Sequence, residues 1–260
     1  MTVYIIQAIT AAISGVVLYF AMDKSIGHST ALDALAKGFD RTVFMDMLNT
    51  HGDNFTLAKS VIIGGILFYF FIGTFLHTGL LVNISKRETS LGLFFSNAVK
   101  YFIPFLGIAT IFTLIALLIL GLIIFPFNLL VGDPLVTFSS EKPYVLWVTT
   151  LIGVFSVIMI ILWGWSISSR LAYLSEGSVF KAIKSGYKTI KLNFIKLFVI
   201  GLSIFLLHIL FMIGYLFTNA DLGAQTWAVV FLGIAMQQVF SLLRVSMRTV
   251  GYVGVNNIVS

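Results

Sequence analysis

The sequence predicts an all-α polytopic membrane protein, a bundle of six transmembrane helices with amphipathic interfacial helices between them. Six long apolar stretches occupy nearly all of the chain, and each has the roughly 20 apolar residues that a helix needs to cross about 30 Å of hydrocarbon. Hydrophobic residues make up 59% of the chain, charged residues only 10%, and the mean hydropathy is +1.04. A soluble domain of 260 residues could not bury so much apolar surface.

The six spans belong to a single transmembrane domain that covers residues 1–260. We place them near residues 3–22, 61–84, 104–130, 144–168, 194–218 and 227–247. The first run follows no basic region and precedes no small-residue cleavage site, so we expect an uncleaved anchor. Pro104 suits the first turn of its helix, where a missing N–H costs nothing. Pro126 is expected to kink or end the same helix near Phe125.

The distribution of basic residues predicts the orientation. The second-to-third and fourth-to-fifth connections and the tail hold eleven of the 16 basic residues and only two acids, Glu88 and Glu176. The alternate segments hold the other five basic residues and eight acids. Because short cytoplasmic loops carry an excess of lysine and arginine, both termini should be cytoplasmic.

One sizeable segment, residues 23–57, is expected on the outer side. Thr30 followed by Asp33 resembles a capping box, and apolar residues then recur at helical spacing. A second short helix is expected after Asp40, with Gly52 near its end. These helices should lie on the outer membrane surface or cap the bundle, and a substrate-binding lid is the alternative.

The two large cytoplasmic connections share a pattern at a constant offset of 88 residues. Ser90 aligns with Ser178, and Ala98 aligns with Gly186. Each serine is a good N-cap for an amphipathic helix along the inner interface, near residues 90–101 and 178–192. Because the offset covers two spans, the repeat is parallel rather than inverted.

These connections carry a family resemblance. The stretch Lys86-Arg-Glu-Thr-Ser-Leu-Gly-Leu-Phe-Phe-Ser-Asn-Ala, and Ser178-Val-Phe-Lys-Ala-Ile-Lys-Ser-Gly-Tyr-Lys with Asn193 at the next span, resemble a broad group of bacterial six-span integral membrane proteins. That group includes the membrane domain fused to some glycerophosphodiester phosphodiesterases. The resemblance implies a bacterial cytoplasmic (inner) membrane protein. No such hydrolase domain is present in this sequence, so its activity does not carry over.

Four lysines form the strongest candidate for lipid contact. They step by three, four and three residues, which places them on one stripe of a helix beside an apolar stripe that includes Phe180 and Tyr187. The four are Lys181, Lys184, Lys188 and Lys191. Ammonium groups in this position favour anionic head groups by about 1 kcal/mol each. The alternative is that they only enforce topology.

Six further polar residues lie in or beside the spans. Arg244 and Arg248 are one turn apart and can reach head groups by snorkelling. Gln237 and Gln238 fall near the middle of the sixth span, as interhelical packing or as a polar path. His77 and His208 are expected about 24 Å and about 9 Å below the outer boundary, which is too unequal for ligands of one haem iron.

No catalytic, metal-binding or cofactor-binding motif was recognised, and the chain has no cysteine. The leading hypothesis is a non-enzymatic scaffold or accessory subunit that binds membrane lipids, anionic on the cytoplasmic side, or a protein partner or second copy, and no nucleic acid. The alternative is a small transporter or permease subunit for an apolar or amphiphilic solute. A membrane-embedded lipid enzyme comes third.

Overall fold

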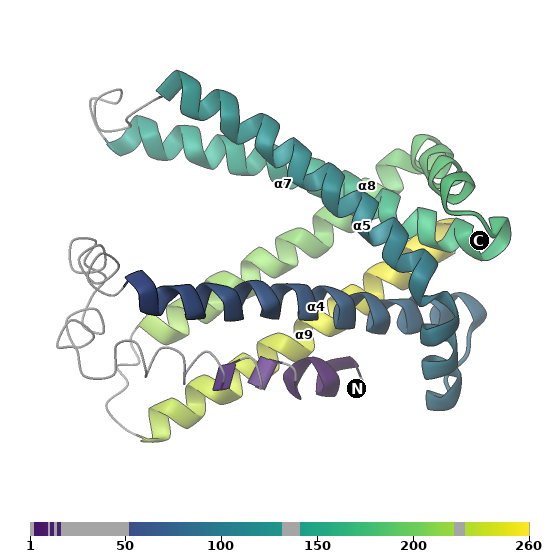
Figure 1. Cartoon of the computed structure of the whole chain (residues 1–260), viewed down its shortest axis with the longest axis horizontal. Helices are drawn as coiled ribbons and strands as arrows, with labels where there is room; N and C mark the ends of the chain where they lie inside the picture. The colour runs from purple at the N-terminus through teal and green to yellow at the C-terminus, as the bar shows by residue number, and fades with distance from the viewer. Residues whose placement is uncertain are drawn as a thin grey trace. The chain divides into compact units, whose positions relative to one another are not determined.

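A computed structural model of the chain describes residues 3–9, 11–12, 15–16, 52–131, 141–220 and 227–259. All regular structure within these ranges is α-helical, which confirms the all-α part of the predicted fold class (Figure 1). The long helices are α4 (Gly52–Lys86), α5 (Leu91–Val131), α7 (Glu141–Glu176), α8 (Val179–Ala220) and α9 (Trp227–Val259).

Four helices in the described part of the chain are long and apolar enough to cross a membrane. These candidate spans are Ile62–Lys86, Leu91–Phe127, Lys142–Glu176 and Val179–Gly214. They cover most of each of the second to fifth spans that the sequence predicts, so the protein has the architecture of a helical membrane protein. Of the first predicted span, residues 3–9, 11–12 and 15–16 are described and are helical, and the sixth predicted span forms part of α9.

The start of α4 differs from the prediction. Gly52 was expected near the end of an outer helix, and residues 52–57 were assigned to the outer segment; instead α4 begins at Gly52. A helix that leaves hydrocarbon keeps its backbone groups paired by continuing into the interface. The rest of the predicted outer segment lies outside the described residues.

The chain divides into two compact units, residues 1–73 and 74–260, and α4 contributes to both. In the first unit, α4 exposes an apolar surface that includes Ile62, Ile63 and Ile66. The rings of Phe70 and Phe71 meet edge to face there, with centroids 5.9 Å apart.

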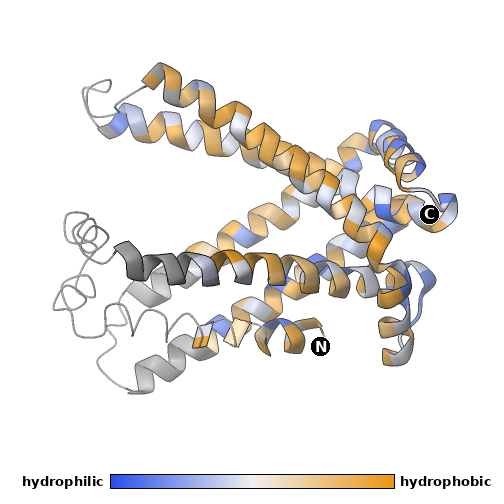
Figure 2. Cartoon of the chain, in the orientation of Figure 1, coloured by the Kyte–Doolittle hydropathy of each residue, from blue (hydrophilic) through white to orange (hydrophobic). Residues whose placement is uncertain are grey.

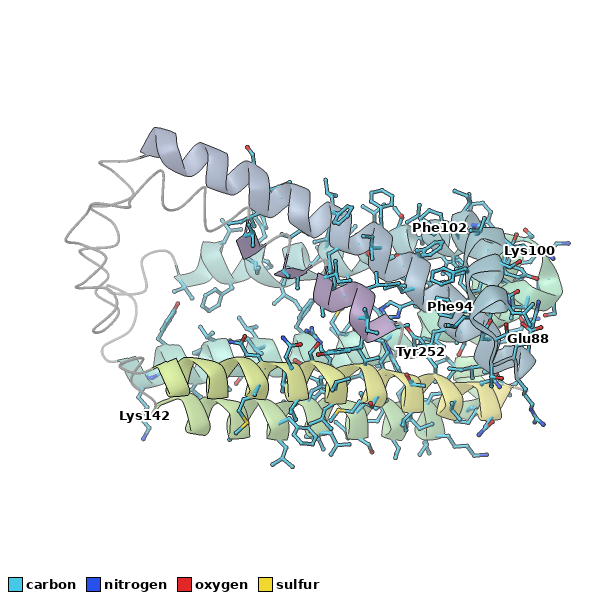
Figure 3. All side chains as sticks on the ribbon, turned by 90° about the horizontal axis from the view of Figure 1, so that it is seen from below. Glu88, Phe94, Lys100, Phe102, Lys142 and Tyr252 are labelled. Atoms are coloured by element: carbon cyan, nitrogen blue, oxygen red, sulfur yellow. The ribbon has the colours of Figure 1, made fainter. Side chains whose placement is uncertain are left out.

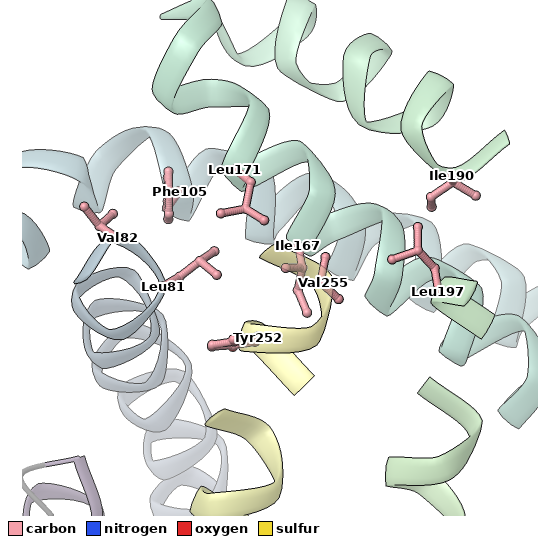
Figure 4. Close-up of a cluster of buried hydrophobic side chains, with 9 residues drawn as sticks. All are labelled: Leu81, Val82, Phe105, Ile167, Leu171, Ile190, Leu197, Tyr252 and Val255. Carbon is pink, nitrogen blue, oxygen red and sulfur yellow. The ribbon is translucent and has the colours of Figure 1, made fainter. Parts of the chain in front are cut away.

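The second unit has a buried core to which all five helices contribute (Figure 4). Its members are Leu81 and Val82 of α4, Phe105 of α5, Ile167 and Leu171 of α7, Ile190 and Leu197 of α8, and Tyr252 and Val255 of α9. Away from this core the long helices expose apolar side chains such as Leu118, Leu129 and Leu146. Figure 2 shows the same pattern as nearly continuous apolar colouring along α5 and α7. Lipid tails match such a surface, whereas water would not.

Two of the predicted spans form one continuous helix with the amphipathic segment that precedes each of them. In α8 the two parts meet at Asn193, whose backbone is non-helical with φ −120° and ψ 28°, and Figure 1 shows α8 changing direction.

In α5 the helix already begins at Leu91, so Pro104 lies well inside it. The prediction that Pro104 occupies a first turn is wrong. The helix also runs through Pro126 to Val131 rather than ending near Phe125. A proline inside a membrane helix frees only one carbonyl, which neighbouring groups can satisfy.

The turns before α5 and α8 end the preceding helices in a related way. Arg87 has φ 58° and Gly177 has φ 65°. After α4, the Glu88 N–H donates to the Asn83 carbonyl at 2.9 Å and the Arg87 N–H donates to Ile84, the pattern of a Schellman motif. After α7, the Gly177 N–H donates to the Tyr173 carbonyl at 3.0 Å. A left-handed arginine costs more than a glycine would, so the first turn carries local strain.

The helices that follow these turns begin 88 residues apart. Ser90 and Ser178 each stand directly before the first helical residue, and their carbonyls accept the N–H groups of Phe94 and Ala182 at 3.0 Å and 2.9 Å. This is the position expected of an N-cap residue. The spacing equals the offset of the predicted repeat.

Small residues allow these segments to cross the preceding helices closely. A Cβ on Gly79 of α4 would lie 2.9 Å from the ring and the carbonyl oxygen of Phe94 of α5. A Cβ on Gly186 of α8 would lie 2.5–2.9 Å from side-chain and backbone atoms of Ser169 of α7. Ala98, the repeat equivalent of Gly186, is fully buried. Close backbone approach at small residues is typical of helix packing in membranes.

Candidate functional site

The first segment of α8 places the four predicted lysines on a solvent-accessible face. Lys181, Lys184, Lys188 and Lys191 are all exposed. The adjoining apolar stripe is divided between two environments. Phe180 is 81% exposed, whereas Ile190 is buried in the core of the second unit. The segment therefore offers four ammonium groups and the phenyl ring of Phe180, while Ile190 attaches it to the core.

Trp165 of α7 is the main attachment of this segment. Its indole Nε1 donates to the Ile183 carbonyl at 3.0 Å, and its ring lies 5.3 Å from that of Tyr187. On its other side the indole meets Phe112 of α5 edge to face at 5.2 Å. The lysine face is thus held at a defined position relative to α5 and α7. We call Lys181, Lys184, Lys188 and Lys191 together the lysine face.

A polar network joins the end of α4 to the start of α5. The Asn97 amide donates to Asn83 Oδ1 at 2.9 Å and to Glu88 Oε2 at 2.7 Å, and Lys86 Nζ donates to Asn97 Oδ1 at 3.2 Å. The ammonium groups of Lys86 and Lys100 also lie 5.5 Å and 5.4 Å from the ring centroid of Tyr101. Because its members satisfy one another, this network stabilises the α4–α5 corner and leaves Glu88 engaged.

The labelled charges mark two ends of the second unit. Figure 3 shows Glu88 and Lys100 at one end and Lys142 at the opposite end. Tyr252 lies toward the end that carries Glu88. This separation provides two positions at which the predicted topology can be probed.

The two arginines that the sequence predicts to contact head groups lie in different environments. Arg244 is exposed, as head-group contact requires. Arg248 is half-buried, and its Nη1 donates to Nε2 of His77 on α4. The His77 ring meets Tyr252 of α9 edge to face, with centroids 5.9 Å apart and an interplanar angle of 87°. His77 and Arg248, treated separately in the sequence, therefore lie in one cluster.

Arg170 of α7 belongs to the same cluster and was missed as a site residue. It lies within electrostatic range of Tyr252 and Arg248, and its own charge acts on His77. Arg170 is one of the eleven basic residues that predict the orientation, and it lies just beyond the predicted span, which ends at residue 168. In the structure α7 continues to Glu176, which keeps Arg170 on the helix and inside the bundle. The only feature of the sequence that could have indicated Arg170 as a site residue is its position just beyond an apolar run.

The remaining candidates lie elsewhere. Gln237 and Gln238 are exposed on α9. His208 of α8 lines a cavity of about 410 Å³ between α7 and α8, together with Phe155, Ser156, Trp163 and Phe205. His208 Nδ1 is 2.8 Å from the Ile204 carbonyl and donates to it, because a carbonyl oxygen can only accept. His77 and His208 are therefore in different environments.

Among the described residues, no group of three or more histidine, cysteine, aspartate or glutamate side chains is arranged to hold a metal ion. Comparisons with protein-family models, curated proteins and solved structures gave no match to this chain. The functional argument therefore depends on the side chains described above.

Proposed function

We propose that this protein is a non-enzymatic scaffold or accessory subunit of a bacterial inner membrane that binds anionic lipid at its cytoplasmic surface. The observation that carries the proposal is the lysine face. Four exposed ammonium groups stand beside the exposed ring of Phe180, on a segment that leads through Asn193 into an apolar helix. An aromatic ring that enters the interface and lysines that reach the phosphates are the two parts of an interfacial lipid-binding helix.

Replacing all four lysines of this face by glutamine should reduce the preference for anionic lipid at least about tenfold. Each basic residue near a membrane surface is worth about 1 kcal/mol, which is about fivefold in affinity. The measurement is native mass spectrometry of protein released from bilayers of phosphatidylglycerol and phosphatidylcholine in equal amounts, comparing the two lipids retained.

The control is the variant with all four lysines changed to arginine, which keeps the charge and should keep the preference. An unchanged lipid ratio in the glutamine variant would show that these lysines act on topology alone.

The six-span topology with cytoplasmic termini is also part of the proposal. It is supported by the separation of Lys100 from Lys142 in Figure 3 and by the excess of basic residues on one set of connections. Because the chain has no cysteine, single cysteines can report sidedness directly. In intact cells, a membrane-impermeant maleimide should label Lys142→Cys and leave Lys184→Cys unlabelled until the membrane is opened. Both positions are exposed. The opposite labelling pattern would reverse the orientation.

The alternative function, a transporter or permease subunit for an apolar or amphiphilic solute, is favoured by one observation. The cavity between α7 and α8 is lined mainly by apolar side chains, and its lining includes the polar side chains of Ser156 and His208. Native mass spectrometry of the protein extracted with its own lipid separates the two functions. A stoichiometric protein partner supports the accessory subunit, and a lone chain or homo-oligomer holding one small molecule supports transport.

A further inference from the structure

Positive charge is concentrated inside the second unit, where α4, α7 and α9 meet. His77, Arg170, Arg248 and Tyr252 form this group, which we call the arginine cluster. The direct contacts are the hydrogen bond from Arg248 to His77 and the edge-to-face contact of His77 with Tyr252. Arg170 adds a second guanidinium within electrostatic range of Arg248.

The described residues provide no carboxylate for these charges. The groups that act on Arg170 are Tyr252 and Arg248, and those that act on His77 are the two arginines. Of the two acids at this end of the unit, Glu88 already accepts from Asn97 and Glu176 is exposed at the end of α7. Arginines inside proteins are ordinarily paired, because an unpaired charge in a low-dielectric environment is strongly unfavourable. The arginine cluster therefore lacks the negative charge that would balance its two arginines.

The hydrogen-bonding groups of the cluster show the same deficit. Arginine can only donate, so His77 Nε2 accepts from Arg248 and the histidine proton is on Nδ1. His77 Nδ1 and Arg170 Nε are buried and have no hydrogen-bond partner in the described part of the chain. Both orphan groups are donors, and what the cluster lacks is an acceptor that carries negative charge.

The depth of the cluster suits an oxyanion that enters from the interface. His77 stands nine positions before the end of α4, and Arg170 stands six before the end of α7. At about 1.5 Å per residue these distances are roughly 14 Å and 9 Å. His77, Arg170 and Arg248 are all half-buried, so the cluster is reachable from the surface of the unit.

We propose that the arginine cluster binds the phosphate group of a ligand, with Arg170 and Arg248 as its charge partners and His77 Nδ1 as a neutral donor. Guanidinium groups match phosphate oxygens in fork geometry, and two of them balance a phosphate monoester dianion. The same chemistry is offered by the head group of a phosphatidate-type lipid and by free phosphate. The site uses none of the lysines of the lysine face, so it goes beyond the proposed function and can fail independently.

Thermal unfolding of the purified full chain, followed by tryptophan fluorescence at constant ionic strength, tests the site. The probes are inorganic phosphate, dihexanoyl phosphatidate and, as the neutral control, dihexanoyl phosphatidylcholine. A ligand that binds only the folded state raises the unfolding temperature with a saturable dependence on its concentration. Saturation by inorganic phosphate identifies a free anion as sufficient, and saturation by phosphatidate alone identifies the lipid head group.

In Arg170→Gln the apparent affinity for the active probe should fall about tenfold or more. Lys142→Gln, an exposed position at the end opposite Glu88, should leave it unchanged. Should Arg170→Gln fail to fold, ³¹P line broadening of the same probe by the wild-type protein, reversed by excess sulfate, replaces the variant. The site is disproved if neither phosphate probe gives a saturable effect, or if Arg170→Gln and Lys142→Gln behave alike.

Discussion

Replacing Phe105 by alanine is expected to destabilise the protein by about 3 kcal/mol, the largest effect of any single truncation in the second unit. The Phe105 ring is fully buried, and its centroid lies 6.1 Å from those of both Tyr101 and Tyr173. It packs in the cluster that joins residues of α4, α5, α7, α8 and α9. Removal of a buried ring leaves a cavity that the surrounding helices cannot close, which costs about 3–5 kcal/mol in soluble proteins. Because lipid is itself apolar, we expect the lower end of that range.

The measurement is the midpoint of unfolding in a titration with sodium dodecyl sulfate, together with the thermal midpoint. A loss of about 3 kcal/mol corresponds to a fall in Tm of roughly 6–12 °C for a chain of this size. The matched control is Phe125→Ala on the same helix, where the side chain is 67% exposed and no cavity forms. Equal effects of the two substitutions would show that the cluster around Phe105 does not hold the helices together.

Replacing Gly186 by alanine is expected to destabilise the protein by about 2 kcal/mol. The new Cβ would lie 2.5 Å from Ser169 Oγ and 2.7 Å from the Ser169 backbone nitrogen. A serine hydroxyl can rotate away, but the backbone nitrogen of α7 cannot move without displacing that helix. Overpacking of this kind typically costs 1–3 kcal/mol. The same substitution would raise helix propensity, so a loss of stability can only come from the crossing.

Gly153→Ala is the control for this substitution. Gly153 is exposed on α7, and a Cβ there meets no atom within 4 Å. We expect it to be neutral or to raise the unfolding midpoint slightly, while Gly186→Ala lowers the Tm by roughly 4–8 °C. A second readout is the lipid preference of the lysine face, because the clash displaces the segment that carries it. Unchanged Tm and unchanged lipid preference in Gly186→Ala would contradict the close crossing of α7 and α8.

The helical content and four candidate spans could be predicted because both are local properties. A run of about 20 apolar residues selects hydrocarbon as its solvent, and in hydrocarbon the backbone must pair with itself. The starts of the helices that follow Ser90 and Ser178 could be predicted as well, because an N-cap acts on the first turn of its own helix. The lysine face could be predicted for the same reason, because helical spacing alone places its members on one side.

The ends of the helices were less predictable. Hydropathy marks where a segment leaves hydrocarbon, but a helix continues as long as its backbone groups have partners. Thus α4 begins at Gly52 rather than near residue 61, and α7 continues past residue 168 to Glu176. Pro104 shows the same principle, since the helix that contains it already begins at Leu91. Each difference lies near an end of an apolar run, where hydropathy falls while the backbone stays paired.

The sequence by itself determined the solvent of this protein, the helical state of its long segments and the side of each helix that carries charge. Only the tertiary structure brought His77, Arg170 and Arg248 together, from three helices that are far apart in the chain. It also decided that Gly186 meets Ser169 and that Ile190 enters the core while Phe180 remains exposed. The physical reason is that hydropathy and periodicity act within one helix. Which faces meet depends instead on how the side chains of different helices pack against one another.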